Sequence, residues 1–186
     1  MVKNRVLWIV LAVVALIFIS GVSMYNGMVS TNEAIDSKWS QVENQLQRRS
    51  DLIPNLVATT KGYAAQEKEI FTQVAEARSK LAGANTVGEK AQADAELSGA
   101  LSRLLVVVER YPALKSDANF RQLADELAGT ENRLAVARKD YNDAVQAYNT
   151  RIKRFPSNMV ANMAGFTARD YFKAADGTQE VPQVQF

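Results

Sequence analysis

Cysteine and histidine are both absent from this chain of 186 residues. The absence of cysteine excludes disulfides and thiolate nucleophiles, and the absence of histidine excludes imidazole acid–base catalysis and nearly all zinc or copper sites. The sequence also lacks a P-loop, a GxGxxG motif and a GxSxG motif, and its acidic pairs do not follow a metal-ligand spacing. We therefore expect a non-enzymatic protein with no catalytic, cofactor-binding or metal site and no evident small-molecule substrate.

Most of the chain carries no net charge. Two of the 22 basic residues, Lys3 and Arg5, precede a long uncharged run, so the remainder carries 20 basic and 20 acidic residues. Proteins that bind nucleic acid obtain much of their affinity by neutralising phosphates with clustered cations. A neutral body without a basic patch therefore predicts no nucleic-acid partner.

An apolar segment near the N-terminus is the strongest positive signal in the sequence. No charged residue occurs from Val6 to Asn32, and residues 6–25 match the length of about 20 residues that a helix needs to cross a bilayer. This pattern predicts a single membrane-spanning anchor over residues 6–25. The alternative is a cleaved signal peptide, because Gly21 and Ser23 are small residues that fit a cleavage site.

The flanks of the apolar segment predict its orientation. Lys3 and Arg5 precede it, whereas the nearest charges that follow it are Glu33 and Asp36. Since cytoplasmic flanks are enriched in Lys and Arg, the N-terminus should stay in the cytoplasm and the body should lie outside it. The predicted parts are a basic cytoplasmic N-terminus, an anchor, a helical bundle and an irregular tail. They cover residues 1–5, 6–25, 26–173 and 174–186.

Heptad spacing marks the next stretch of the chain. From Ile35 to Leu81, eleven of fourteen positions that alternate by four and three residues are apolar, which predicts one long helix with one buried side. Pro54 lies within this stretch, and an internal proline usually kinks a helix. Because the spacing keeps its register across Pro54, we expect a kink and not a chain reversal. The alternative is a new helix capped by Ser50 or Asp51.

Turn signals divide the rest of the body. The segment GANTVG at 83–88 predicts a turn, and the helix that follows over residues 89–110 should end before Tyr111-Pro112. The alternative is that Tyr111-Pro112 kinks a longer return helix. A third long helix should close at Phe155-Pro156, with a short helix or two after it. The predicted fold is all-α: an N-terminal transmembrane helix followed by an elongated up-and-down antiparallel bundle of three long helices plus a short C-terminal helix.

The densest polar group of the sequence lies in the motif RRSDLIPN. It comprises Arg48, Arg49, Asp51 and Asn55. Arg49 falls on the heptad seam, where a charge is costly unless it is paired. We therefore interpret the group as a structural polar cluster at the kink, with Arg49 paired to an acid on a neighbouring helix such as Glu131 or Glu67. A binding site is the alternative.

The final residues of the chain alternate apolar and polar side chains. Val181, Val184 and Phe186 are the apolar members of EVPQVQF. An extended tail of this kind can add as a strand to the edge of a partner's sheet, which makes these three residues a candidate partner-binding tail. A disordered end is the alternative.

These motifs, in this order, resemble the LemA family over nearly the whole chain. The resemblance rests on the ordered set: Trp39, RRSDLIPNLV at 48–57, KGY at 61–63, YPALK at 111–115, Phe155-Pro156 and Tyr171-Phe172. It implies a helical bundle on a retained single membrane anchor in bacteria, and no known enzymatic activity. One departure is Gln66, where family members often carry histidine, so any role of that histidine does not transfer.

Two functions follow from this reading. The first is a scaffolding or interaction protein of the bacterial cell envelope, in the inner (plasma) membrane, that acts through helix–helix contacts with protein partners and through self-association. The second is an accessory subunit that presents partners or substrates to a membrane enzyme such as a protease. The long apolar seams favour the first, and the tail favours the second.

Overall fold

The computed structural model describes residues 2–173, and all regular structure in this range is helical. The helices are α1 (Val2–Tyr63), α2 (Lys68–Gly83), α3 (Val87–Val108), α4 (Pro112–Ser116), α5 (Ala118–Lys153) and α6 (Ser157–Ala164). The all-α fold class predicted from the sequence is confirmed. The candidate tail residues Val181, Val184 and Phe186 lie outside the described range.

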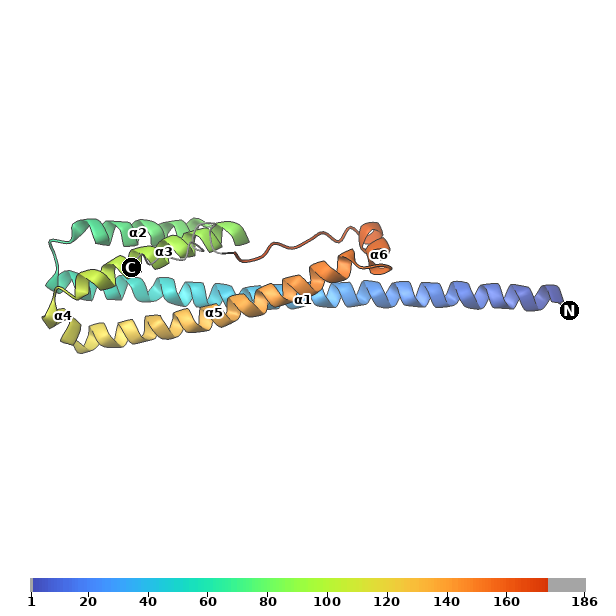
Figure 1. The fold of residues 1–186 in the computed structure, drawn as a ribbon, viewed down its shortest axis with the longest axis horizontal. Helices are drawn as coiled ribbons and strands as arrows, with labels where there is room; N and C mark the ends of the chain where they lie inside the picture. Colours follow the sequence, from blue (N-terminus) through green and yellow to red (C-terminus); the bar gives the residue numbers. More distant parts are fainter. Residues whose placement is uncertain (1, 174–186) are drawn as a thin grey trace, which may run out of the picture. The chain divides into compact units, whose positions relative to one another are not determined.

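The described helices belong to two compact units. Unit 1 comprises Met1–Trp39 and Asp140–Arg169, and unit 2 comprises Ser40–Lys139 together with the segment that starts at Asp170. α1 begins in unit 1 and ends in unit 2, whereas α5 begins in unit 2 and ends in unit 1 (Figure 1). Each of these two helices therefore contributes to two separate cores.

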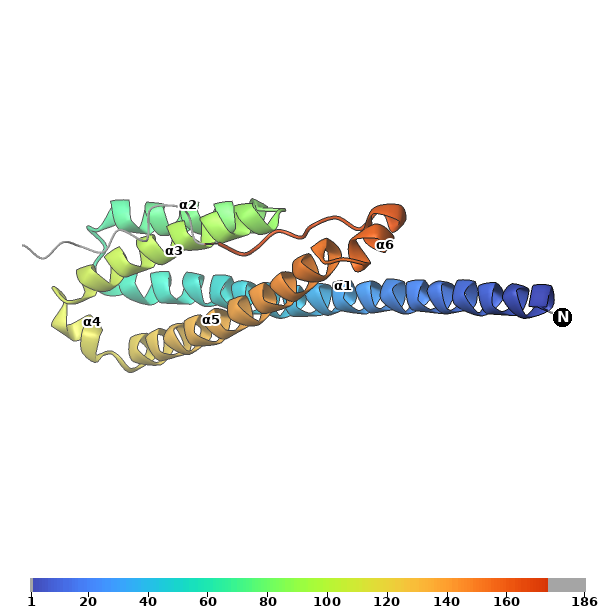
Figure 2. The same cartoon turned by 45° about the vertical axis from the view of Figure 1, so that its right-hand side comes forward.

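Unit 2 is an up-and-down helical bundle. Its four long segments are residues 40–63 of α1, α2, α3 and residues 118–139 of α5, and successive segments alternate in direction (Figures 1 and 2). The apolar seam positions form its core. The fully buried side chains include Val42, Ile53, Leu56, Val74, Leu97, Leu104 and Leu134. Each such side chain stabilises the folded state by about 1.5–3 kcal/mol relative to an exposed one.

The single helix predicted over residues 35–81 is two helices, so the prediction of three long helices in the bundle is wrong. α1 ends and α2 begins on either side of a turn at residues 64–67. The heptad spacing shifts by one residue around this turn. It predicts buried residues at positions 63 and 70, whereas Ala64 and Phe71 are buried instead. The turn contains no Gly, Pro, Asn or Asp, so no turn signal marks it in the sequence.

α1 continues through Pro54 as one helix, which excludes a new helix capped by Ser50 or Asp51. A proline has no N–H for the carbonyl four residues earlier in a helix. Here that carbonyl belongs to Ser50, and it accepts a hydrogen bond from Nε of Arg78 on α2 at 3.0 Å. The neighbouring helix therefore supplies the hydrogen bond that the proline removes. The kink at Pro54 stays a prediction.

The turn predicted at residues 83–88 separates α2 from α3. Thr86 caps α3, because its Oγ1 accepts from the Glu89 N–H at 3.1 Å. The Glu89 carboxylate accepts in return from the Thr86 N–H at 3.0 Å. This reciprocal pair is a capping box, which satisfies two N–H groups that a helix start otherwise leaves without partners.

Tyr111-Pro112 is a turn and not a kink in a longer helix. α3 ends at Val108, and α4 opens with the proline in its first turn, where a missing N–H costs nothing. The following helix, α5, is capped by Asp117, whose Oδ1 accepts from the Phe120 N–H at 2.9 Å. α5 then ends at Lys153, close to the end predicted from the sequence.

Unit 1 combines the first part of α1 with the last part of α5 and with α6. Met28, Ile35 and Val145 are fully buried in it. The rings of Trp39 and Tyr141 pack against each other, with centroids 5.1 Å apart. α6 is the short C-terminal helix that the sequence predicts.

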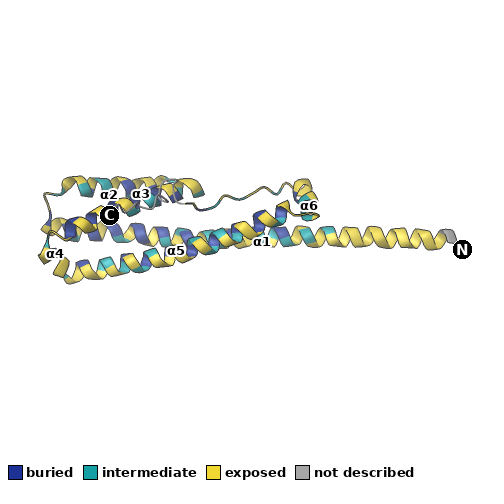
Figure 3. Cartoon of the chain, in the orientation of Figure 1, coloured by how far each residue is buried: buried dark blue, intermediate teal, exposed yellow. Residues whose placement is uncertain are grey.

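The first part of α1 carries large apolar side chains that are exposed (Figure 3). Among the described helices, α1 is the one that is long and apolar enough to cross a membrane. Trp8 and Tyr25 lie near the two ends of the apolar segment, as aromatic residues do at the two surfaces of a bilayer.

Candidate functional site

Arg49 is paired inside unit 2. Its side chain is 5% exposed, and its Nη1 donates to Oδ1 of Asp94 on α3 at 2.7 Å. Its Nη2 donates to Oγ of Ser98, one turn further along α3, at 2.9 Å. Hydrogen bonds between charged groups are stronger than neutral ones, so Arg49 joins α1 firmly to α3.

A second arginine and a second acid complete the group. Arg138 on α5 donates from Nη2 to the other carboxylate oxygen of Asp94. Oε2 of Glu131, also on α5, lies 2.8 Å from Nη1 of Arg49, and its Oε1 lies 3.7 Å from Nη1 of Arg138. We call Arg49, Asp94, Glu131 and Arg138 the charge cluster. Its two positive and two negative side chains balance, which suits the buried Arg49 and Asp94, because an unpaired charge in the interior costs several kcal/mol.

Every charged group of the charge cluster has an oppositely charged neighbour, but some of its polar atoms form no hydrogen bond. The contact between Glu131 and Arg49 has the distance of an ion pair without the geometry of a hydrogen bond. The Nε atoms of Arg49 and Arg138 are also buried without an acceptor among the described residues. Because Coulomb attraction depends on distance and not on hydrogen-bond direction, the 2.8 Å contact still neutralises charge.

Burial raises the pKa of the Asp94 carboxyl above its ordinary value, since desolvation disfavours the charged form. The positive charges of Arg138 and Arg49 oppose that rise. Both oxygens of Asp94 are engaged by guanidinium groups, so the carboxylate has little capacity left to bind a ligand. The arrangement can hold α1, α3 and α5 in one register, a role that buried ion pairs perform in some proteins.

The segment after α6 returns to the charge cluster. The ring of Phe172 is 6% exposed and lies 5.1 Å from the guanidinium carbon of Arg138. A guanidinium over an aromatic face contributes about 0.5–1 kcal/mol at exposed sites and more when desolvated. This contact holds the end of the described chain on α5 within unit 2.

The charge cluster overlaps only in part with the polar cluster predicted from RRSDLIPN. Arg48, Asp51 and Asn55 are exposed and do not join Arg49. Asp51 instead accepts from Nε2 of Gln47 one turn earlier at 2.8 Å. Residues so close in a helical sequence point to different sides of the helix, which explains the separation.

Two of the partners were not found by sequence reasoning. Glu131 pairs with Arg49 as expected, but Glu67 pairs with Arg110 at 3.1 Å. Asp94 lies three residues before Leu97, on the apolar side of its helix, and an acid at such a position was the available signal. Arg138 gave no comparable signal, because it lies beside the seam and not on it.

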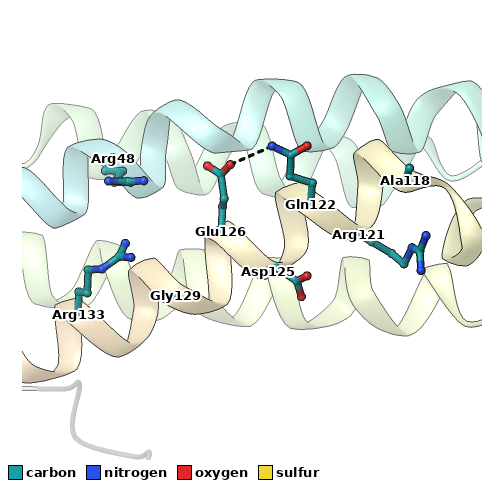
Figure 4. Close-up of a pocket in the computed structure, with 8 residues that line it drawn as sticks. All are labelled: Arg48, Ala118, Arg121, Gln122, Asp125, Glu126, Gly129 and Arg133. Carbon is teal, nitrogen blue, oxygen red and sulfur yellow. Dashed lines mark hydrogen bonds between the residues drawn. The ribbon is translucent and has the colours of Figure 1, made fainter.

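Arg48 lines an open groove of unit 2, with a volume of about 520 Å³. The other lining residues come from α5: Ala118, Arg121, Gln122, Asp125, Glu126, Gly129 and Arg133. Arg133 points toward Arg48, and Nε2 of Gln122 donates to Glu126 at 3.4 Å (Figure 4). Cations and carboxylates are mixed along the groove, so it favours no ligand of a single charge. Across residues 2–173, no group of three carboxylates gathers that could hold a metal ion.

Comparison with known proteins finds a matching family and several relatives of this chain. The sequence model of the LemA family matches residues 38–186. Magnetosome protein MamQ 2 of Paramagnetospirillum magneticum is 34% identical, over 88% of this chain and 70% of that protein. Magnetosome protein MamQ of Magnetospirillum gryphiswaldense is 29% identical, over 86% and 70%. Protein LemA of Metamycoplasma hominis is 25% identical, over 84% and 74%.

Proposed function

This chain belongs to the LemA family, and we propose that it is a membrane-anchored, non-enzymatic scaffold or interaction protein of the bacterial cell envelope. One observation carries the proposal. α1 is a single helix that contains an exposed apolar segment long enough to cross a bilayer and, further on, the buried seam of unit 2. The same helix would therefore serve as the anchor and as a structural part of the body.

The charge cluster supports a non-enzymatic role. A general base or nucleophile needs a side chain that can reach a substrate. Among the described residues of unit 2, Asp94 has the most deeply buried carboxylate, which is engaged by two guanidinium groups and is 3% exposed. Its chemistry is therefore used to join helices.

The basic flank supports an orientation for the anchor. Lys3 and Arg5 precede the apolar segment, and Glu33 and Asp36 follow it, so the N-terminus would be cytoplasmic and the body extracytoplasmic. The location would be the bacterial inner membrane. Two of the relatives described above are named magnetosome proteins.

Two fusions of the full chain test the topology. Alkaline phosphatase, which is active only outside the cytoplasm, and green fluorescent protein, which fluoresces mainly inside it, would each follow the C-terminus. We expect phosphatase activity without fluorescence, and we expect both fusion proteins in the membrane fraction. A protein that starts near Met24 and leaves the membrane without detergent would refute the anchor.

Chemical crosslinking in intact membranes tests the interaction role. A scaffold should give ladders of its own copies or complexes with several envelope proteins. A single stoichiometric complex with a membrane enzyme such as a protease would favour the accessory-subunit function instead. If this chain stays uncrosslinked while a known membrane complex crosslinks in the same sample, the interaction role is wrong.

A further inference from the structure

Unit 1 has an exposed apolar surface beyond the apolar segment of α1. Phe155, which follows α5, is 75% exposed, and Met159 and Met163 of α6 are 58% and 89% exposed. The two methionines are four residues apart, so they lie on the same side of α6. Outside α1, these three are the large apolar side chains of unit 1 that are exposed in the described structure. They form what we call the α6 surface.

Contacts within unit 1 place the α6 surface near the end of the apolar segment. The ring of Phe166, just after α6, lies 5.6 Å from that of Tyr25. Nη1 of Arg151, just before α6, donates to the carbonyl of Gly27 at 2.9 Å. A span over residues 6–25 would fill a hydrocarbon layer of about 30 Å. Both contacts would therefore lie at the level of the lipid headgroups.

Glycine at position 27 makes the second contact feasible. A Cβ at this position would lie 1.9 Å from Nη2 of Arg151, closer than atoms can approach. The guanidinium of Arg151 consequently rests directly on the backbone of α1. The end of α5, which leads into α6, is held at this level of the anchor helix.

The segment that contains α6 is basic. Residues 144–169 contain four basic residues and no acidic residue, and one of the four, Arg169, pairs with Asp36 of α1. Lys153 and Arg154, immediately before Phe155, are exposed and have no ion-pair partner among the described residues. The first acid of α1 after Tyr25 is Glu33, about 12 Å further along the helix. The vicinity of the α6 surface is therefore basic as well as apolar.

We propose that the α6 surface docks onto the bilayer that α1 crosses. Phe155, Met159 and Met163 enter the interfacial layer, and Lys153 and Arg154 contact the headgroups of anionic phospholipids. Helices that lie in a membrane interface combine an apolar side with basic residues in this way. The inference rests on the proposed membrane anchor and adds a second point of attachment, which would restrain the rotation of the anchor about its axis.

Site-directed spin labelling of the full chain tests the docking. The natural sequence has no cysteine, so a Met163→Cys variant carries one label, at a side chain that is 89% exposed and can be replaced without disturbing a core. The protein is reconstituted into vesicles that contain phosphatidylglycerol. The measured quantity is the ratio of the label's collision rate with oxygen, which enters the bilayer, to its collision rate with a water-soluble nickel complex. We expect this ratio to be several-fold higher for Met163→Cys than for a label at Val136→Cys, an exposed position of unit 2.

A label at Leu16→Cys separates the two ways in which the test can fail. If this label lies deep in the bilayer while the Met163→Cys label reports water, the docking is wrong and the anchor stands. If the Leu16→Cys label also reports water, the anchor itself is wrong. Magnetic coupling between Met163→Cys labels without membrane insertion would show that a second copy covers the α6 surface, and would overturn the proposal. Loss of insertion in a Lys153→Gln/Arg154→Gln variant supports the headgroup contact, and unchanged insertion refutes it.

Discussion

Replacement of Arg49 tests whether the charge cluster joins the helices of unit 2. Arg49→Ala removes a guanidinium that lies 2.7 Å from Asp94 and 2.8 Å from Glu131. Two acids would then share Arg138 alone. Removal of one member of a buried ion pair costs about 3–5 kcal/mol, and because Arg138 remains on Asp94 we expect the lower end, about 3 kcal/mol. The melting temperature of a chain of this size changes by about 2–4 °C per kcal/mol, so the expected decrease is about 6–12 °C.

The assay is thermal unfolding of the full chain in detergent, followed by circular dichroism. Arg48→Ala is the matched control, because it removes the same side chain type at the next position of α1, where it is exposed. Exposed substitutions usually change stability by less than about 0.5 kcal/mol. The control should therefore shift the melting temperature by less than about 2 °C.

A double variant separates pairing from packing. Arg49→Met keeps much of the apolar stem, and Asp94→Asn removes the acid that it would leave uncompensated. If the two residues are coupled, the double variant should lose less stability than the sum of the single variants. A decrease below about 2 °C for Arg49→Ala, or one equal to that of Arg48→Ala, would refute the structural role of the cluster. Arg49 would then be a binding residue, and its loss should remove a crosslinked partner.

Three further predictions concern local features of α1, α2 and α3. Arg78→Met should cost about 1 kcal/mol because it leaves a carbonyl of α1 without its donor, and Pro54→Ala in the same chain should recover part of that loss in thermal unfolding by restoring a backbone N–H. Glu89→Ala should lower the melting temperature at pH 7, because backbone N–H groups bind the Glu89 carboxylate and hold its pKa below its ordinary 4.5. The difference in melting temperature between the variant and the natural chain should vanish as the pH falls through that lowered pKa. A difference that persists at pH 2 would contradict this prediction. Gly27→Ala should stabilise an Arg151→Ala variant by about 1 kcal/mol through helix propensity, but should stabilise the natural chain less, since the Cβ displaces the guanidinium.

Features that depend on neighbouring residues could be predicted from the sequence. The apolar segment of α1, the turn before α3 and the end of α3 before Pro112 are examples. Each follows from chain length, turn composition or backbone restriction within a few residues. The need for a partner to Arg49 also followed, because an apolar period places that residue in a core. All of these features can be read from the types and spacing of residues that are close together in the chain.

The identity of the partners was decided by tertiary structure. Asp94 and Arg138 come from α3 and α5, and only the packing of three helices brings their side chains within reach of one another. The turn at residues 64–67 was hidden because an apolar period can cross a short turn with a slip of one residue. The position of α6 beside Tyr25 likewise depends on a contact between segments far apart in the chain. Periodicity shows which side of a helix is buried, but the helix that covers it depends on where the chain reverses.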